Sequence, residues 1–366
     1  MKKIIDFKQF EGVLRHLAFD SKNSQGRRYE EDEEISLYGD FYDPFQLDIE
    51  KIRLGKFYRR LNDKTQVFPP EKHANIRNRQ SHTNEVVSLS SFVASVLGLN
   101  KNLTEAIAYG HDIGHTAFGH LGERIISDIS GKKFSHAVMS VVAAQSVERN
   151  GKGLNLCFET LIGMLNHPRG GKEMKILNDV SKEASLDMVS DKIAYIFSDL
   201  NDAFKVGCLQ ESNAPMALIR EFGKNQRERI ATTAYALIKE SSEQGNISFS
   251  LSDKAVKFAE LRAWMYKNVY HQLDIGYNRL EKEKYLKRLF RLFPQDILFE
   301  NIDPLFLLSI LTDSEAKKLA TMRYSRINKS ILGFAEIALG LNGGGREIDI
   351  FNHDLNVKDF KFHKVS

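Results

Sequence analysis

The densest group of chemically reactive side chains in this sequence lies in the segment AYGHDIGHTAFGHLGE, residues 108–123. Its polar members are His111, Asp112, His115, His120 and Glu123. Neutral imidazoles and carboxylates are frequent ligands of divalent cations, and a cation offsets the free-energy cost of burying them. Because the rest of the segment is apolar enough to belong to a core, we predict a metal site here rather than a solvated loop.

The order of these residues along the chain resembles the HD superfamily of metal-dependent phosphohydrolases. In that superfamily the metal ligands are a His, then an adjacent His-Asp pair, then a distant Asp. The matching residues are His82 in RNRQSH, the pair His111-Asp112, and Asp191 in LDMVSDKIAY. The resemblance implies one divalent metal ion per active site. This ligand set suits Mn, Mg, Fe, Co, Ni or Zn and does not distinguish among them.

A longer run of motifs resembles the deoxyguanosine triphosphate triphosphohydrolase family, which are HD-type dNTPases. The similarity covers residues 43–205 in unbroken order, through DPFQLDIEKIRLGKFYRRLNDKTQVF, RNRQSH, HDIGHTAFGHLGE and FSHAVMS. It thins beyond that point, where Ile310-Leu311-Thr312-Asp313 stands for the usual Gly-Met-Thr-Asp. The resemblance implies hydrolysis of a dNTP to deoxynucleoside and inorganic triphosphate, by attack of water on the α-phosphorus.

A stripe of polar side chains accompanies the last predicted metal ligand. Asp191, Tyr195 and Asp199 are four residues apart, so on a helix they project from one face. In the family the matching Tyr packs under the deoxyribose, and the matching second Asp accepts a hydrogen bond from the 3′-hydroxyl. Gln66 matches a family Gln that also contacts this hydroxyl. The resemblance therefore implies a sugar site along the stripe.

The phosphates of a nucleotide need fixed cationic or polar partners. Arg79 and Lys192 stand close in sequence to predicted metal ligands and match family positions that contact the phosphates. His115 resembles another phosphate contact. We therefore expect these three residues to bind the triphosphate.

Proton transfer is the last part of the chemistry to be assigned. His120 and Glu123 match a catalytic His-acid pair of the family, and we predict that Glu123 orients His120 as the proton-transfer group. His136 matches a further active-site His, with the alternative of a helix N-terminal residue beside a capping Ser135. His167 precedes a proline, and we interpret it as a structural loop residue.

The elements that must position these side chains are predicted to be helices, because apolar residues recur at spacings of three and four. One helix should end near Gly110. Amphipathic segments are expected at roughly 85–97, 103–109, 136–149, 185–204 and 258–270. The fold class is therefore all-α, an HD-domain helical core with additional C-terminal helices. We divide the chain into an N-terminal arm (1–42), the HD phosphohydrolase core (43–210) and a C-terminal helical region packed on the core (211–366).

Composition excludes several classes of protein. The net charge of +4 on 366 residues is too small to indicate a nucleic-acid binder by bulk charge. Cys157 and Cys208 lack the spacing of a disulfide framework or a cysteine zinc site, which fits a reducing, cytoplasmic setting. No apolar run resembles a signal peptide or a membrane span, so we expect no membrane partner.

Two other functions stay open beside dNTP hydrolysis. One is an HD phosphohydrolase acting on another nucleotide, such as a dNMP or a signalling nucleotide. The other is a nucleotide-sensing or nucleic-acid-binding protein, for which the basic segment 282–293 could contact single-stranded DNA. The apolar spacing of that segment favours an amphipathic packing helix instead. The family resemblance also implies a homo-oligomer, commonly a hexamer, and a nucleotide effector.

Overall fold

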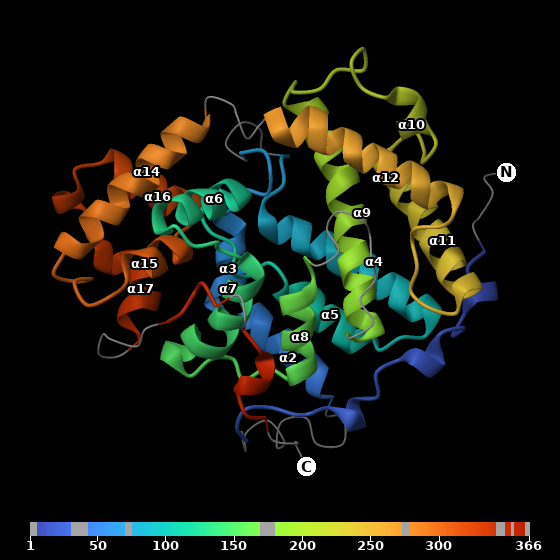
Figure 1. The fold of residues 1–366 in the computed structure, drawn as a ribbon, viewed down its shortest axis with the longest axis horizontal. Helices are drawn as coiled ribbons and strands as arrows, with labels where there is room; N and C mark the ends of the chain where they lie inside the picture. The colour runs from blue at the N-terminus through green and yellow to red at the C-terminus, as the bar shows by residue number, and fades with distance from the viewer. Residues whose placement is uncertain are drawn as a thin grey trace.

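The described part of the chain folds mainly into α-helices, with shorter 3₁₀- and π-helical turns between some of them (Figure 1). The computed structural model describes residues 6–30, 43–69, 75–168, 180–272, 278–341, 348–352 and 355–362. Within these ranges no strand forms, and an isolated bridge joins Thr65 to Asn78. The all-α prediction is confirmed. Much of the predicted N-terminal arm, residues 31–42, lies outside the described residues.

The first half of the chain supplies the helices that carry the predicted site residues. The helices are α2 (Pro44–Leu54), α3 (Lys56–Arg60), α4 (Arg79–Leu97), α5 (Lys101–Gly110), α6 (Gly119–Ser130), α7 (His136–Val142), α8 (Phe158–Asn166) and α9 (Lys182–Lys205). α5 ends at Gly110, as expected. α4 begins six residues before the amphipathic pattern because Asn78 and Ser81 form a reciprocal capping box ahead of it. The helix expected at 136–149 ends at Val142 and continues as a π-helical turn, η7 (Ala143–Val147).

The second half adds two groups of helices on opposite sides of the first (Figure 1). One group is α10 (Met216–Arg220), α11 (Gln226–Gln244), α12 (Asp253–Met265) and the π-helical turn η9 (Tyr266–Tyr270). The other group is α14 (Asn278–Leu292), α15 (Pro304–Ile310), α16 (Asp313–Thr321) and α17 (Gly333–Leu339). α11 and α12 pack on α9, whereas α14 and α15 pack on α6. Each group shares one large apolar cluster with the helices it covers.

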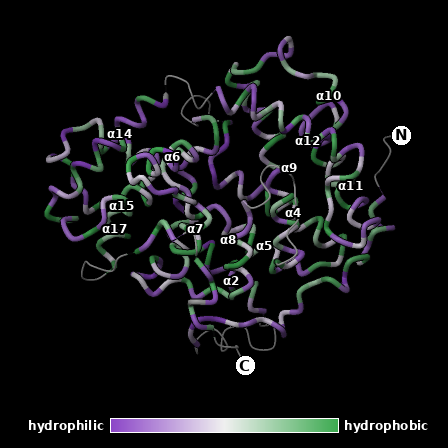
Figure 2. Tube along the Cα trace, in the orientation of Figure 1, coloured by the Kyte–Doolittle hydropathy of each residue, from purple (hydrophilic) through white to green (hydrophobic). Residues whose placement is uncertain are grey.

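The centre of the molecule is a packed trio of helices, α4, α5 and α9, which all contact one another. Along these helices hydrophobic residues alternate with hydrophilic ones (Figure 2), so each helix turns an apolar face to its neighbours. α2 and α8 pack against α5 from the other side. None of the described helices combines the length and the apolar character that a membrane crossing requires.

One buried carboxylate, Asp313, helps to tie the C-terminal helices to the centre, beside the ion pair of Arg60 with Glu315. Asp313, the first residue of α16, accepts hydrogen bonds from the backbone N–H of Thr65 at 3.0 Å and from that of Phe118 at 2.7 Å. The Thr65 hydroxyl donates to the same side chain. Burial raises the pKa of the Asp313 carboxyl, and these donors hold the carboxyl group in place. The two segments that contain Gln66 and His120 are thereby fixed to one point.

We expect Asp313→Ala to lower the free energy of unfolding by about 2–4 kcal/mol, because two buried backbone N–H groups lose their acceptor. Urea denaturation followed by circular dichroism measures this change. The matched control is Asp128→Ala, since Asp128 is 59% exposed and its ion pair with Arg279 lies on the surface. A loss no larger than in the control would contradict the role of Asp313.

Candidate active site

The four residues predicted to bind metal come together where α4, α5 and α9 meet. His82 extends from α4, His111 and Asp112 follow the end of α5, and Asp191 extends from the middle of α9. His82 Nε2 lies 3.0 Å from Asp191 Oδ1. His111 Nε2 lies 3.6 Å from Asp112 Oδ1 and 4.0 Å from Asp191 Oδ1. His82, His111 and Asp112 also offer ligand atoms that all lie within 4.8 Å of one another.

This geometry fits a divalent cation. The Nδ1–H of His111 donates to the carbonyl of Ala108 at 2.7 Å, so its buried Nε2, which has no hydrogen-bond partner, turns a lone pair toward the carboxylates. Ligands at right angles on bonds of about 2.1 Å are about 3.0 Å apart, and opposite ligands about 4.2 Å. The measured separations of 3.0 to 4.0 Å fall between these limits.

The electrostatics of the centre are dominated by buried negative charge. Burial opposes ionisation of Asp191, but the hydrogen bond and charge of His82 lower its pKa to about 2. Burial likewise opposes protonation of His111, yet the surrounding carboxylates, Asp112 first, raise its pKa. Arg79 gives Asp112 a cationic partner, with Nη1 2.7 Å from Oδ2. The predicted phosphate contact Arg79 is therefore engaged with a candidate metal ligand.

Asp187 is a buried carboxylate that the sequence analysis missed. It lies one helical turn before Asp191 on α9 and is fully buried, and neither of its oxygens has a hydrogen-bond partner among the described residues. Burial raises its pKa to about 7. Asp187 extends the four-residue repeat of Asp191, Tyr195 and Asp199 by one step toward the N-terminus, so this spacing was the signal in the sequence that could have identified it. Its position adds a further negative charge beside His111.

A second cluster surrounds Glu123 on α6. Its oxygens pair with His120 Nδ1 at 3.0 Å and with His136 Nδ1 at 2.6 Å. The ring of His115 stacks on that of His136 with centroids 3.9 Å apart. Glu123 also accepts the backbone N–H of His136, and Ser135 makes no capping bond, so the alternative of a Ser135 cap is wrong. Burial raises the pKa of the Glu123 carboxyl, but the neighbouring His136 and His115 outweigh burial and hold this pKa well below its usual range.

Small residues allow these segments to approach. A Cβ on Gly114 would lie 2.2 Å from the backbone nitrogen of Ser140, so only glycine lets the turn after Asp112 pack against α7.

At the start of α6, Phe118 adopts a left-handed conformation with φ of 64°. Such a conformation is costly outside glycine and persists where surrounding contacts fix it, here the bond to Asp313.

The polar stripe on α9 forms as predicted, with Tyr195 and Asp199 following Asp191 on the buried helix. The Nζ of Lys192 is buried without a hydrogen-bond partner, and burial followed by the charge of Arg262 lowers its pKa to about 8. Asp199 accepts the hydroxyl of Tyr270 at 2.8 Å and pairs with Arg77. Gln66 is buried as well, and its Oε1 lacks a partner.

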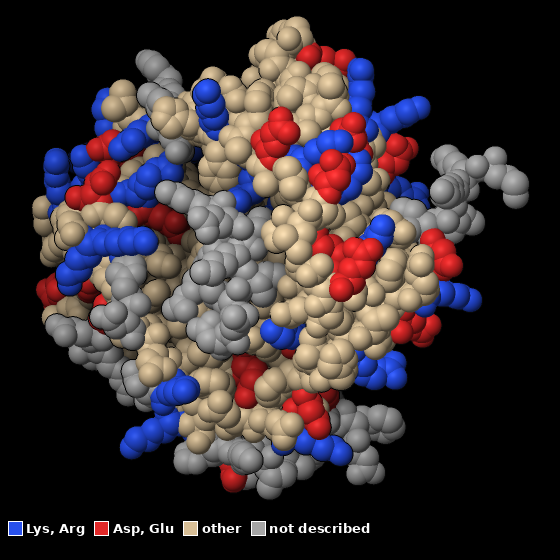
Figure 3. All heavy atoms as spheres, turned by 45° about the vertical axis from the view of Figure 1, so that its right-hand side comes forward, with Lys and Arg blue, Asp and Glu red and all other residues tan. Residues whose placement is uncertain are grey.

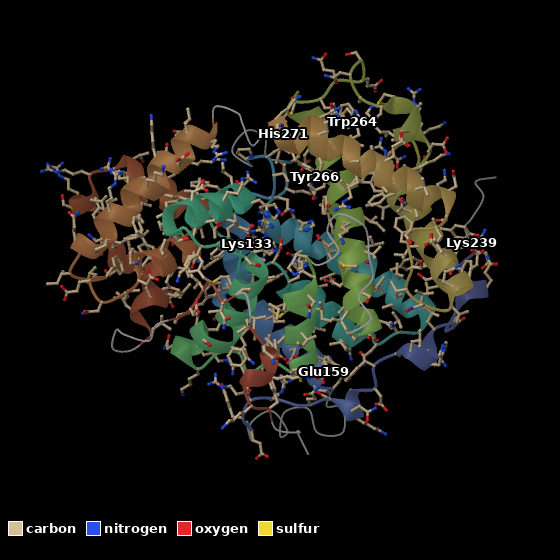
Figure 4. The ribbon with its side chains drawn as sticks, viewed as in Figure 1. Lys133, Glu159, Lys239, Trp264, Tyr266 and His271 are labelled. Atoms are coloured by element: carbon tan, nitrogen blue, oxygen red, sulfur yellow. The ribbon has the colours of Figure 1, made fainter. Side chains whose placement is uncertain are left out.

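Residues from α12 and η9 complete the stripe. Arg262 Nε donates to the hydroxyl of Tyr195 at 3.1 Å, and the hydroxyl of Tyr266 lies 3.3 Å from the same oxygen. Figure 4 shows Tyr266 at the end of α12, where η9 begins, next to α9. These residues were missed, although Arg262, Tyr266 and Tyr270 repeat the four-residue spacing that marked the stripe on α9.

His167, which we interpreted as a structural loop residue, lies in the turn after α8, and the structure brings it next to the candidate site. It follows α8 directly and is buried, with Nε2 3.0 Å from Nε2 of His136. Its ring also lies 5.0 Å from that of His111. The proline after His167 indicated a loop. The Nδ1–H of the His167 ring donates to the carbonyl of Met164 in the last turn of α8, and this hydrogen bond points the ring inward.

Comparison with known proteins agrees with this geometry. The HD domain model matches residues 79–196, which include all four predicted metal ligands. A deoxyguanosinetriphosphate triphosphohydrolase-like protein of Caldanaerobacter subterraneus subsp. tengcongensis is 34% identical over 80% of this chain and 81% of its own. Proteins of the same name from Clostridium tetani and Clostridium perfringens (strain 13 / Type A) are 35% and 36% identical, over 68% and 74% of this chain and 71% and 78% of theirs. A solved structure of a hypothetical protein from Aquifex aeolicus aligns at 15% identity with a TM-score of 0.44, over 77% of this chain and 70% of its own.

The unpartnered carboxylate of Asp187 predicts a pH dependence of stability for the metal-free protein. Its folded-state pKa of about 7 lies above the ordinary value of 3.8, so the folded state holds a proton that the unfolded state loses between these values. The stability contributed by that proton is present below pH 4 and is lost as the pH rises toward 7.

Asp187→Asn should remove this decline, giving the variant a gain on the order of 1–3 kcal/mol over the native chain at pH 8 and little gain at pH 4. Urea denaturation in EDTA at both pH values measures it. The control is Asp128→Asn at the surface. Equal stability differences at the two pH values would contradict the burial of an unpaired charge.

Proposed function

Because this chain belongs to the deoxyguanosinetriphosphate triphosphohydrolase-like family of HD-domain proteins, we propose that it hydrolyses a dNTP to deoxynucleoside and inorganic triphosphate. Water attacks the α-phosphorus, and the bond from phosphorus to the 5′-oxygen breaks. The observation that supports the proposal most is the convergence of four side chains of metal-ligating type beside a tyrosine and a buried lysine on α9. The Nζ of this lysine has no hydrogen-bond partner among the described residues.

The proposed metal ligands are His82, His111, Asp112 and Asp191. Their separations and the free lone pair of His111 support this assignment. When bound, a divalent cation supplies Lewis-acid polarisation of a phosphate oxygen and favours ionisation of the attacking water. Arg79 holds the second oxygen of Asp112, so that the first faces the other ligands. We assign Arg79 this orienting role beside the phosphate contact implied by resemblance.

The triphosphate is proposed to lie between α9 and the turn that carries His115. Lys192 supports this position, because its buried ammonium group has no hydrogen-bond partner in the part of the chain that the structure describes and would gain one from an anionic ligand. Arg262 lies close enough to lower the pKa of Lys192, so the two cations share one neighbourhood. His115 is buried 3.2 Å from Asp112 Oδ1 and joins the phosphate end to the metal ligands.

The deoxyribose is proposed to lie on Tyr195, with Asp199 and Gln66 at its 3′-hydroxyl. Asp199 is a fixed acceptor, since Arg77 and Tyr270 hold its carboxylate in place. Tyr195 is held by Arg262 in the same way. A 2′-hydroxyl would crowd the Tyr195 ring, which gives the site a preference for deoxynucleotides.

His120 is the proposed acid that gives a proton to the departing 5′-oxygen. Its Nδ1 faces Glu123 at 3.0 Å, which orients the ring and leaves Nε2 for the proton transfer. The side chain is 58% exposed, so solvent can restore the proton after each turnover. His136 shares the same Glu123 and completes the catalytic group.

The remaining proposals concern partners. A homo-oligomer, a hexamer by resemblance, and a nucleotide effector follow from the family. For single-stranded DNA the candidate surface is α14, whose Leu286 and Leu289 are buried as an amphipathic packing helix requires. Figure 3 shows Lys and Arg interspersed with Asp and Glu over one face of the molecule, without a continuous basic track. Hydrolysis is therefore favoured over the nucleic-acid-binding alternative.

Product analysis tests the proposed reaction. Purified protein with Mn²⁺ or Mg²⁺ and each of the four dNTPs is expected to release deoxynucleoside and triphosphate in equal amounts, separated by anion-exchange chromatography. The Asp191→Ala variant, lacking a metal ligand, should release neither. Formation of dNMP and pyrophosphate, or turnover of dNMP alone, would contradict cleavage of the bond between the α-phosphorus and the 5′-oxygen of a dNTP, and would point to another HD phosphohydrolase activity.

Lys192→Gln tests the phosphate site. Losing a charge-assisted hydrogen bond of about 1.5–3 kcal/mol should reduce kcat/KM about 10- to 100-fold. Bound metal should stay at the native level, because Lys192 is no ligand. Lys239→Gln on α11, far from the site in Figure 4, serves as the control. An unchanged kcat/KM in Lys192→Gln would remove this residue from the substrate site.

A further inference from the structure

One buried arginine next to the polar stripe of α9 is held by three carboxylates. Arg77 pairs with Asp199 through Nη2, and its Nη1 lies 3.0 Å from Glu85 Oε2. Its Nε lies 3.0 Å from Asp202 Oδ2, and its backbone N–H donates to the same oxygen at 3.4 Å. Glu85 belongs to α4, and the two aspartates belong to α9. The guanidinium group therefore joins two helices that carry predicted metal ligands.

Asp202 is itself fixed from two sides. Besides Arg77 it faces Lys205, whose Nζ lies 3.2 Å from Asp202 Oδ1 and donates to the backbone carbonyl of Asn75 at 3.1 Å. Asp202 is 3% exposed and Arg77 is 9% exposed, so water and salt screen their ion pair little. The position of the Arg77 guanidinium group is thus determined at its Nε end by a carboxylate that has its own anchor.

The geometry of a guanidinium group transmits these contacts to Asp199. The group is planar, and its N–H bonds point in fixed directions. Once Nε and Nη1 are bound to their carboxylates, the direction of Nη2 is determined, and Nη2 is the atom that pairs with Asp199. A lysine would keep the charge but could not bind three carboxylates in fixed directions. Glu85 and Asp202 therefore orient Asp199 through Arg77.

Asp199 can use this fixed orientation to bind a hydroxyl group. It is 1% exposed, and its Oδ2 accepts the hydroxyl of Tyr270 at 2.8 Å. Each carboxylate oxygen accepts about two hydrogen bonds, so a hydroxyl of a substrate can be added to these contacts. Arg77 gives the buried carboxylate a cationic partner, which favours its charged form. A hydrogen bond to a charged acceptor is stronger than one between neutral groups, so a substrate without the hydroxyl loses a strong bond.

We call Arg77, Asp202 and Glu85 the Arg77 cluster. We propose that the Arg77 cluster sets the preference of the site for nucleotides with a 3′-hydroxyl by holding Asp199 as the acceptor of that hydroxyl. The inference rests on the proposed function, in which Asp199 binds the 3′-hydroxyl, and deepens it. The three residues are positioning residues, because they act through Asp199 and not by contact with the nucleotide.

A comparison of two substrates tests the proposal. For each of the four bases, kcat/KM is measured with the dNTP and with the 2′,3′-dideoxynucleoside triphosphate, which lacks the hydroxyl. For the native protein we expect a ratio of about 10- to 100-fold in favour of the dNTP. Arg77→Lys and Asp202→Asn should lower this ratio about 5- to 10-fold, mainly by slowing turnover of the dNTP.

Two matched controls make the same changes at the surface. Arg279→Lys alters an ion pair with Asp128, and Asp253→Asn alters one with Lys257. Both controls should keep the native ratio. A purely structural effect of a substitution in the Arg77 cluster would reduce turnover of both nucleotides alike, so the ratio separates positioning from a loss of folded protein.

An unchanged ratio in Arg77→Lys and Asp202→Asn would overturn the proposal. A native ratio near one would overturn it too, whether or not the variants fold. The proposed function fails separately: release of dNMP and pyrophosphate with the expected fall in the ratio would keep the Arg77 cluster, whereas release of triphosphate with an unchanged ratio would keep the reaction. If no nucleotide is turned over, calorimetric titration with the 2′-deoxynucleoside and the 2′,3′-dideoxynucleoside measures the same preference as a ratio of Kd.

Discussion

Buried negative charge is the constraint on which the site depends. Asp112, Asp187 and Asp191 surround His111 in the interior formed by α4, α5 and α9. Arg79 is engaged with Asp112 and Asp191 faces an imidazole, whereas Asp187 has no hydrogen-bond partner in the described part of the chain. Carboxylates are expensive to bury without compensation, and a divalent cation at their meeting point supplies it. The interior formed by the three helices therefore suits a bound divalent cation.

The same constraint explains why distant parts of the chain enter the site. Metal and phosphate chemistry needs ligands held to within a fraction of an ångström. A turn reaches this precision only when contacts with other parts of the chain fix its backbone. Asp313 of the C-terminal helices fixes the backbone on either side of the centre, beside Gln66 and His120. The buried Nζ of Lys64 donates a hydrogen bond to the backbone carbonyl of His115 and thereby stiffens the turn that carries His115. The C-terminal helices are therefore part of the catalytic framework.

What the sequence could predict was local. The all-α class followed from apolar spacing, and the stripe through Tyr195 followed from a four-residue repeat on one helix. The residues that were missed depend on packing between helices. His167 reaches His136 because α8 packs on α7, and Arg262 reaches Tyr195 because α12 packs on α9. Asp187 is important because its carboxylate has no hydrogen-bond partner among the described residues. Neither composition nor spacing reveals whether a side chain has such a partner.

The most direct test of the account is anomalous diffraction from crystals of the manganese-loaded protein, recorded at the manganese absorption edge. The central claim is that the buried carboxylates and imidazoles of the HD motif exist to hold a divalent cation. It predicts a strong peak about 2.0–2.3 Å from Nε2 of His82 and His111 and from a carboxylate oxygen of Asp112 and Asp191. Peaks confined to surface carboxylates, with none among these four side chains, would contradict it.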